Sequence, residues 1–443
     1  MAGGSGRTSN ASLGFFIGPC LPLAGVGLPL VVHLPTFYAR DLGLSLSAVT
    51  AAFLLVRLVD ILFDPILGAL MDRTRSRLGR FRPWLVASAP VLMLASLMLF
   101  MAKPGVSAAY LWLGLVIVYL GFSMGSLSQQ AWAAALAPGY DQRSRIYGWW
   151  QAGNVLGILL VLLLPPLVEI VFKGTRVQGV QAMGWFIIAL SPVTIGLAVW
   201  RVAEPGSGRA AAPTASFADY RALLRNGSVV RLMVTDLLLG WAPGLTGALF
   251  LFYFDQVKGV PEGPTNLLLL VYFVAAMLGA PLWSWLAVRI GKHRALAVNC
   301  VAAVVTLLVV MASPMTSFPV AAALMALAGL PYSGSVLLRA MLADVGDELK
   351  LQTGLDRTGL LYSLLTATNK IGTALALVSF VILDALHFDA SAHHNPPAAV
   401  AGLQALFVGA PALLSLLAGA VIMGYRLDAG RHAEIRAALA AES

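Results

Sequence analysis

The chain has 443 residues, of which 59% are hydrophobic and 11% are charged. Because a soluble domain carries about 25% charged residues, this composition excludes an ordinary soluble protein and predicts an all-α polytopic membrane protein. The net charge of +9 does not indicate a nucleic-acid partner, because no basic face interleaved with aromatic residues occurs among the predicted helices. The two cysteines, Cys20 and Cys300, lie inside apolar stretches, so no disulfide framework is expected.

Twelve apolar stretches follow the polar start of the chain. A helix that crosses a bilayer needs about 20 apolar residues, and each stretch approaches or exceeds that length. The expected transmembrane helices are residues 12–37, 46–71, 83–102, 107–135, 146–171, 182–202, 228–254, 265–288, 295–312, 318–342, 358–384 and 399–425.

Arginine and lysine gather in alternate connections, from the arginine-rich loop after the second stretch to the tail after the last one. By the positive-inside rule, this asymmetry places both termini in the cytoplasm. Segment 203–227 is rich in Pro, Gly, Ser and Ala, which is typical of a flexible linker. It separates a six-helix half, residues 1–202, from a second half, residues 228–425, and a cytoplasmic tail, residues 426–443.

The two halves also share short sequence patterns. Arg143-Ser-Arg-Ile-Tyr-Gly follows the fourth stretch, and Arg357-Thr-Gly-Leu-Leu-Tyr follows the tenth. Two parallel six-helix repeats are typical of a major-facilitator transporter, whose substrate site lies at mid-membrane between the halves. The sequence therefore predicts that fold.

Three charged residues stand in the middle of the second stretch. Arg57, Asp60 and Asp64 share one helical face, because they are spaced i, i+3 and i+7. A charge at mid-membrane costs roughly 2.5–3.5 kcal/mol, so this face must look into a bundle or a watery cavity. Two carboxylates one turn apart can share Na⁺ or a proton, with Arg57 neutralising one of them. The alternative is a static Arg–Asp network that holds helices together.

Two further ionisable residues lie inside predicted helices of the second half. Lys370, in the eleventh stretch, shares a face with Thr366 and Thr373. It is predicted to be a substrate ligand or a coupling charge that faces the region of Asp60 and Asp64, and the alternative is a salt bridge between the halves without substrate contact. Asp236, in the seventh stretch, is either a third acidic site or one partner of an ion pair with Arg231.

Polar and aromatic residues in the fourth and fifth stretches are candidate substrate contacts. Ser128, Gln129 and Trp132 combine hydrogen-bonding capacity with a ring on which a sugar can stack, but they fit inter-helix hydrogen bonding equally well. Trp149 is either a substrate contact or an interfacial aromatic residue.

The loop after the second stretch is a candidate inner gate. Its arginines, like those after the fourth stretch, can form charge-assisted hydrogen bonds to neighbouring helix ends that close the gate in one state and release it in the other. Topological anchoring explains the same charges. The gate candidates are Asp72, Arg73, Gly79, Arg80, Arg143 and Arg145.

The run from Phe37 to Trp84 resembles the glycoside–pentoside–hexuronide:cation symporters, typified by the melibiose permease. It contains Arg57-Leu-Val-Asp60-Ile-Leu-Phe-Asp64-Pro and Asp72-Arg-Thr-Arg-Ser-Arg-Leu-Gly79-Arg-Phe-Arg. The segments Arg143-Ser-Arg145-Ile-Tyr-Gly and Tyr362-Ser, Thr366 and Lys370-Ile-Gly follow in the family's order. The resemblance implies cation-coupled uptake by alternating access, with Asp60 and Asp64 as cation ligands, Lys370 near the cation site and Trp132 beside the sugar.

The sequence also departs from that family. The first stretch has no acid, Ser128 stands where the family has an acid in helix four, and Gly153 stands near its sugar-binding arginine. The cation half of the site is therefore retained, whereas the charged sugar-binding half is missing. This argues against a galactoside, and it weakens sodium coupling relative to proton coupling.

These observations predict a secondary active symporter that imports a sugar-like or glycoside-like solute with H⁺ or Na⁺. The partners expected are that solute, the monovalent cation and the lipid bilayer of a bacterial inner membrane, and the carrier is expected to act as a monomer. A lipid-like or other amphipathic solute is the alternative. No nucleotide loop, zinc-ligand spacing or hydrolase motif occurs, so neither an enzyme nor a cofactor is expected, and no metal other than Na⁺ at Asp60 and Asp64.

Overall fold

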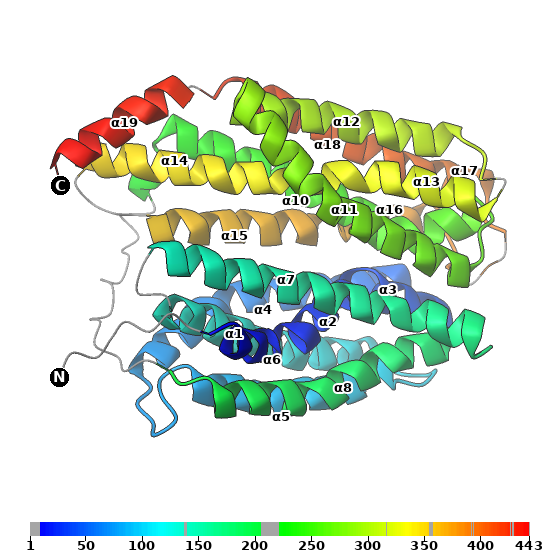
Figure 1. Cartoon of the computed structure of the whole chain (residues 1–443). Coiled ribbons are helices and arrows are strands. Elements are labelled where there is room, and N and C mark those ends of the chain that lie inside the picture. Colours follow the sequence, from blue (N-terminus) through cyan, green and yellow to red (C-terminus); the bar gives the residue numbers. More distant parts are fainter. Residues whose placement is uncertain are drawn as a thin grey trace. The chain divides into compact units, whose positions relative to one another are not determined.

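The computed structural model describes residues 9–136, 140–204, 221–315, 317–353, 358–390, 392, 394–425, 427 and 429–442. The chain divides into two compact units, Met1–Ala212 and Pro213–Ser443. All named elements in the described ranges are helices, as Figure 1 shows.

Unit 1 contains five long helices and several short helical segments. Its elements are α1 (Asn10–Ile17), α2 (Cys20–Val31), α3 (His33–Thr36), η1 (Phe37–Asp41), α4 (Leu46–Arg73), α5 (Arg82–Phe100), α6 (Ala108–Leu136), α7 (Tyr140–Pro166), η2 (Leu167–Val171) and α8 (Arg176–Arg201).

Unit 2 begins where Asn226 caps a long helix by accepting hydrogen bonds from the backbone N–H groups of Ser228 and Val229. Its elements are α10 (Gly227–Gln256), α11 (Glu262–Ile290), α12 (Lys292–Ala312), α13 (Phe318–Gly329), η3 (Leu330–Gly334), α14 (Ser335–Thr353), α15 (Thr358–Leu375), α16 (Val378–Ala385), α17 (Pro397–Gln404), η4 (Ala405–Gly409), α18 (Ala410–Met423) and α19 (Ala429–Glu442).

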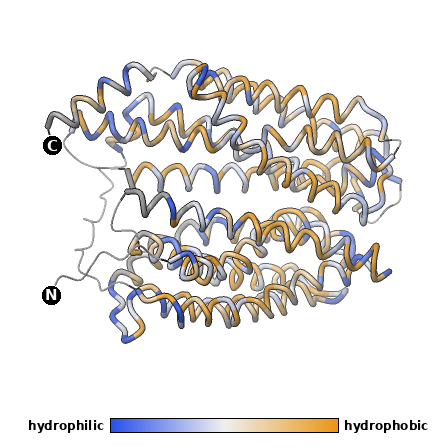
Figure 2. Tube along the Cα trace, in the orientation of Figure 1, coloured by the Kyte–Doolittle hydropathy of each residue, from blue (hydrophilic) through white to orange (hydrophobic). Residues whose placement is uncertain are grey.

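Eleven helical segments among the described residues are long and apolar enough to cross a membrane. Figure 2 shows the hydrophobic residues along the bodies of the helices. The predicted second span corresponds to α4, which is not one of the eleven; among the described residues its apolar segment is Leu46–Arg57. Its 28 residues extend over about 42 Å at 1.5 Å per residue, more than a bilayer core requires. The expected total of twelve spans thus depends on α4 and, like the cytoplasmic termini, stays a prediction.

Small residues let neighbouring helices of unit 1 approach closely. A Cβ atom on Gly157 of α7 would lie 2.7 Å from the carbonyl oxygen of Leu21 on α2, and one on Gly153 would lie 2.9 Å from Ile17. Close contacts at small residues are the usual way in which helices pack in membranes. They fix the register of α7 against α1 and α2.

In unit 2 the helix α10 packs against α15, α18 and α14. A Cβ atom on Gly372 of α15 would lie 2.5 Å from the carbonyl oxygen of Leu237 on α10, so the two backbones nearly touch. An apolar core that includes Leu232, Met233 and Leu365 surrounds the inner part of this seam.

Candidate functional site

The carboxylate of Asp60 lies between α4 and α6 in unit 1. Its side chain is 2% exposed. The hydroxyl of Ser123 donates a hydrogen bond of 3.1 Å to its Oδ1, and the Nη1 atom of Arg57 lies 3.7 Å from its Oδ2. The guanidinium of Arg57 also lies over the ring of Tyr119, 4.8 Å from the ring centroid. The Ser123 hydroxyl and the Arg57 guanidinium thus both act on this carboxylate, and Arg57 also contacts the ring of Tyr119.

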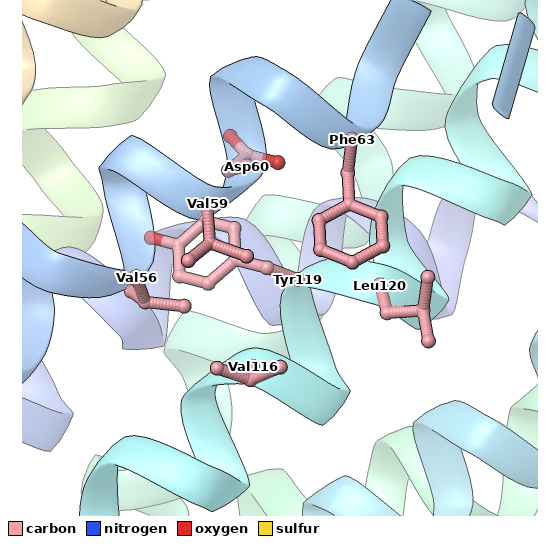
Figure 3. Close-up of a pocket in the computed structure, with 7 residues that line it drawn as sticks. All are labelled: Val56, Val59, Asp60, Phe63, Val116, Tyr119 and Leu120. Carbon is pink, nitrogen blue, oxygen red and sulfur yellow. The ribbon is translucent and has the colours of Figure 1, made fainter. Parts of the chain in front are cut away.

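Helix geometry explains why these four residues meet. Arg57 and Asp60 are three residues apart on α4, and Tyr119 and Ser123 are four residues apart on α6, so each pair lies on one helix face. The packing of α4 against α6 brings the two faces together. Figure 3 shows Asp60 and Tyr119 approaching each other from the two helices.

A small, partly open pocket adjoins the carboxylate. Asp60 and the hydroxyl of Tyr119 supply the polar side-chain atoms of its lining. The remaining lining residues are hydrocarbon side chains from α4 and α6, as Figure 3 shows: Val56, Val59, Phe63, Val116 and Leu120. In such apolar surroundings a charge interacts more strongly with its partners than it would in water. Losing one of them would leave a costly buried charge.

Asp64, the second predicted carboxylate, lies one turn further along α4 and is only partly buried. The structure thus gives the two acids different surroundings. Asp60 is enclosed, whereas Asp64 retains exposed surface. As a set, the two carboxylates and the Ser123 hydroxyl offer the oxygen ligands that a hard monovalent cation prefers.

The substrate candidates on α6 are packed inside unit 1. Ser128 is buried and donates a hydrogen bond to the carbonyl of Gly125. Gln129 is buried and donates to the carbonyl of Phe16, at 3.1 Å, and to the Sγ atom of Cys20. The two hydrogen bonds of Gln129 fasten α6 to α1 and α2, as inter-helix hydrogen bonding would require, whereas that of Ser128 stays within α6. Their role as substrate contacts stays a prediction.

The two candidate tryptophans join the same apolar core. Trp132 is fully buried and packs edge-on against Phe16, with ring centroids 5.4 Å apart. Trp149 is partly buried on α7 and packs against that core. In this structure Trp132 has no exposed face on which a sugar could stack, and the predicted sugar contact of either ring remains untested.

The three candidates in unit 2 all lie on α15. Thr366 is exposed and donates its hydroxyl hydrogen bond to the carbonyl of Tyr362, at 2.9 Å. Thr373 hydrogen-bonds backbone carbonyls of its own helix, and Lys370 is partly buried. A polar face on α15 thus exists, whereas its part in transport stays a prediction.

Asp236 on α10 is buried, with 4% of its surface exposed. Its Oδ2 accepts a hydrogen bond of 2.7 Å from the hydroxyl of Thr368 on α15. The suggested ion pair with Arg231 does not form among the described residues, and the guanidinium of Arg231 lies instead beside Gly424. Five residues correspond to about 140° around a helix, so Asp236 and Arg231 point away from each other.

The loop between α4 and α5 is held by a carboxylate that follows α8. Glu204 accepts hydrogen bonds from the backbone N–H groups of Arg80 (2.8 Å), Phe81 (3.1 Å) and Arg82 (3.2 Å). These N–H groups lie at the start of α5, where a helix attracts negative charge. Gly79 has φ +111°, and a Cβ there would lie 2.3 Å from Glu204 Oε2. Glycine at this position therefore permits both the turn and the approach of Glu204.

The contacts and exposure of the other gate candidates differ from residue to residue. Arg145 donates a hydrogen bond to the side chain of Asn10 at the start of α1, and Arg73 is exposed in the last turn of α4. The side chains of Asp72 and Arg143 lie outside the described residues. The gating role of all six residues stays a prediction.

Sequence reasoning did not assign a role to Ser123, Tyr119, Glu204 or Thr368. Ser123 is one of several polar residues in the fourth apolar stretch, so the sequence marked it as unusual but did not show which residue it contacts. Glu204 was marked more weakly, as an acidic residue directly after the sixth predicted span. Nothing in the sequence indicated Tyr119 as the ring beneath Arg57.

Comparison with known proteins gives one consistent result. Residues 15–429 match the sequence profile of a family described as MFS/sugar transport protein. A glucuronide carrier protein homolog of Escherichia coli strain K12 is 23% identical over 414 residues, covering 91% of this chain and 90% of that protein. A second protein of that strain, provisionally named a glycoside/cation symporter, is 26% identical and covers 87% of this chain and 85% of its own length.

The fold is also that of a solved transporter. The crystal structure of the nucleoside transporter NupG superposes with a TM-score of 0.68 at 15% identity, covering 94% of this chain and 100% of that one. At this identity the likeness concerns the fold.

Proposed function

The chain belongs to the MFS/sugar transport protein family, and we propose that it takes up a sugar or glycoside together with a monovalent cation. It is a multi-pass transporter of the bacterial inner membrane rather than an enzyme. The relatives named a glucuronide carrier homolog and a glycoside/cation symporter support the solute class and the coupling. Both termini lie in the cytoplasm in this proposal, and the carrier works as a monomer.

The observation that carries the proposal is the buried carboxylate of Asp60 with Arg57 as its internal counter-charge, 3.7 Å away. Without a bound cation, Arg57 neutralises Asp60, so the empty carrier does not hold an unpaired charge in apolar surroundings. An arriving cation replaces Arg57 at Asp60, and Arg57 turns toward Asp64 while it keeps its contact with the ring of Tyr119. Solute uptake is coupled to the cation because only the occupied arrangement completes the substrate site.

The pocket lining favours a proton over sodium. Na⁺ needs several oxygen ligands, whereas Asp60 and Tyr119 are the polar members of a lining that is otherwise hydrocarbon. A proton needs only the carboxylate itself. Asp64 and Ser123 would complete a sodium site if they turned toward the same point.

The proposed solute contacts are the polar face of α15, with Thr366, Lys370 and Thr373, and the aromatic residues Trp132 and Trp149 of unit 1. The loop that Glu204 holds, with Arg80 beside it, forms part of the proposed inner gate. Each of these roles is inferred for an individual side chain from the membership of the chain in the family.

A proteoliposome uptake assay tests the proposal directly. Purified carrier is challenged with labelled glucuronides, pentosides, disaccharides and lysolipids, under an inward proton gradient, an inward sodium gradient or neither. We expect concentrative uptake of one saccharide class under the proton gradient. Uptake of lysolipid alone would support the amphipathic alternative, and saccharide uptake that no gradient accelerates would contradict coupling.

Two variants connect the assay to the site. Asp60→Asn should abolish gradient-driven accumulation, whereas Asp384→Asn, which changes a partly buried carboxylate near the end of α16, should retain it. Unchanged accumulation by Asp60→Asn would remove Asp60 from the coupling site.

A further inference from the structure

We propose that Asp236, together with Thr368 and Asn369, forms a proton-binding site inside unit 2, separate from the Asp60 pocket. The inference does not depend on the solute or on the proposed coupling at Asp60, because it concerns the protonation of one side chain in the resting protein. It adds a second titrating carboxylate to the carrier.

The first support is the burial of a carboxylate among neutral partners. Asp236 is 4% exposed, and the apolar core residues Leu232, Met233 and Leu365 surround this part of the α10–α15 seam. Its hydrogen-bond partners are the Thr368 hydroxyl, at 2.7 Å, and the Asn369 amide. Among the described residues no cation lies within ion-pair distance of it. An ionised carboxylate that is buried without an ion-pair partner is destabilising, and protonation removes that charge.

The second support is the hydrogen-bond arithmetic at Thr368. Its Oγ1 lies 2.7 Å from Asp236 Oδ2 and 2.9 Å from the carbonyl oxygen of Leu365. A hydroxyl has one hydrogen to donate, so an ionised Asp236 and Leu365 compete for it. If Asp236 carries a proton, it donates to Thr368, and Thr368 donates onward to Leu365. Only in the protonated form can Thr368 be hydrogen-bonded to both of these oxygens at once.

The ionisable residues on the helices that pack against α10 define the charges that can act on Asp236. α10 packs against α15, α18, α14, η4, α11 and α17. Arg339, on α14, interacts electrostatically with Asp236. α18, η4 and α17 contain no ionisable residue. The other ionisable residues of the packed helices are Arg231, Tyr253 and Asp255 on α10, Tyr362 and Lys370 on α15, Glu262, Tyr272 and Arg289 on α11, and Asp344, Asp347, Glu348 and Lys350 on α14.

Close packing keeps the three partners in place. A Cβ on Gly240, one turn after Asp236, would lie 3.2 Å from the Nδ2 atom and from the carbonyl oxygen of Asn369. Together with the contact of Gly372 at Leu237, this shows that the backbones of α10 and α15 lie close together next to Asp236. The close approach holds Asn369 beside the turn of α10 that follows Asp236.

Infrared difference spectroscopy of the purified carrier between acidic and alkaline pH tests the proposal, because protonated carboxyl groups absorb apart from carboxylates. We expect a carboxylic C=O band that disappears in Asp236→Asn. In Thr368→Val the band should remain but shift, because its hydrogen-bond partner is gone. Asp255→Asn, on the same helix and hydrogen-bonded to its neighbour Gln256, is the matched control and should leave the band unchanged.

The outcomes separate this proposal from the proposed transport function. A wild-type spectrum that Asp236→Asn leaves unchanged, with a thermal melt showing that the variant is folded, would overturn it. If Asp236→Asn does not fold, an identical band position in wild type and Thr368→Val would overturn it instead. Failure of solute uptake in the vesicle assay would leave the spectroscopic result unaffected.

Discussion

The hydroxyl of Ser123 on α6 donates a 3.1 Å hydrogen bond to the carboxylate of Asp60 on α4. It joins two helices that are far apart in the sequence, at the point where a charge is buried in a membrane-spanning bundle. A hydrogen bond to a charged group contributes about 1.5–3 kcal/mol, so this contact influences how readily Asp60 takes up a cation.

Replacing Ser123 by Ala should distinguish the two candidate coupling ions. If the ion is a proton, the pH dependence of uptake should change, because the carboxylate that takes up the proton has lost a hydrogen-bond donor. If the ion is sodium, a ligand is lost, and the sodium concentration for half-maximal uptake rises by about 10-fold, the equivalent of 1.4 kcal/mol. Ser126→Ala, on the same helix, is the control. Identical ion dependence in wild type and Ser123→Ala would show that the contact plays no part in coupling.

Replacing Arg57 by Gln should separate exchange from net uptake. The loaded carrier, with a cation on Asp60, no longer needs Arg57, so exchange of external for internal solute should persist. The empty carrier would hold an unpaired buried carboxylate, and net uptake should fall by at least about 10-fold. Tyr119→Phe keeps an aromatic ring beneath the guanidinium and should retain both activities. Loss of exchange and net uptake in equal proportion would contradict this role for Arg57.

Replacing Gly79 by Ala should destabilise the loop between α4 and α5. A non-glycine residue at strained positive φ costs about 1–3 kcal/mol, and the added Cβ would also displace Glu204. Gly105→Ala provides the matched control, since Gly105 has φ +95° and an added Cβ would meet no atom within 4 Å. Thermal unfolding in detergent measures the difference. If Gly79→Ala lowers the unfolding temperature more than Gly105→Ala does, the difference measures the disturbed contact with Glu204. If both variants lower it equally, backbone strain alone explains the effect.

Trp132 should behave as a core residue when truncated. Removing a fully buried tryptophan costs about 3–5 kcal/mol in soluble proteins, so Trp132→Ala should lower the yield of folded carrier. Trp132→Phe preserves the edge contact with Phe16 and should remain folded, which makes the predicted sugar contact measurable. A raised KM with normal stability in Trp132→Phe would support that contact, and an unchanged KM would leave Trp132 as packing alone.

The C-terminal helix α19 is fastened to α14 by a histidine. His432 Nε2 lies 3.1 Å from Asp347 Oδ2 and 3.5 Å from Asp344 Oδ1, while Ile435 is buried. His432→Ala should increase amide hydrogen exchange in residues 429–442. Arg431→Ala removes a highly exposed ion pair with Glu434, of a kind that contributes little, and should leave the exchange unchanged. Equal exchange in wild type and His432→Ala would show that apolar packing alone holds α19.

Much of the fold followed from the sequence because long apolar stretches in a bilayer must be helices. The helical repeat also fixed Arg57, Asp60 and Asp64 on one face of α4, whatever that face meets. The membrane class, the helical fold and the family therefore agreed with expectation. Boundaries differed by several residues, as at α8, which begins at Arg176 rather than at 182, because a span can continue beyond its most apolar window.

The partners of the charged residues did not follow from the sequence. Helix period says which residues share a face, but the register between two helices depends on how side chains and glycines of distant segments interlock. That register places the hydroxyl of Ser123 against Asp60 and the ring of Tyr119 under Arg57. It also makes Thr368, rather than Arg231, the partner of Asp236.

The sequence by itself thus determined that this protein is a helical membrane protein with charges in the middle of one helix, because hydropathy and periodicity are local properties. Its resemblance to the symporter family added the expectation of transport. Only the tertiary structure decided which charge is enclosed, which loop Glu204 holds and where a second carboxylate is buried. These depend on contacts between segments distant in sequence, whose spacing is set by packing.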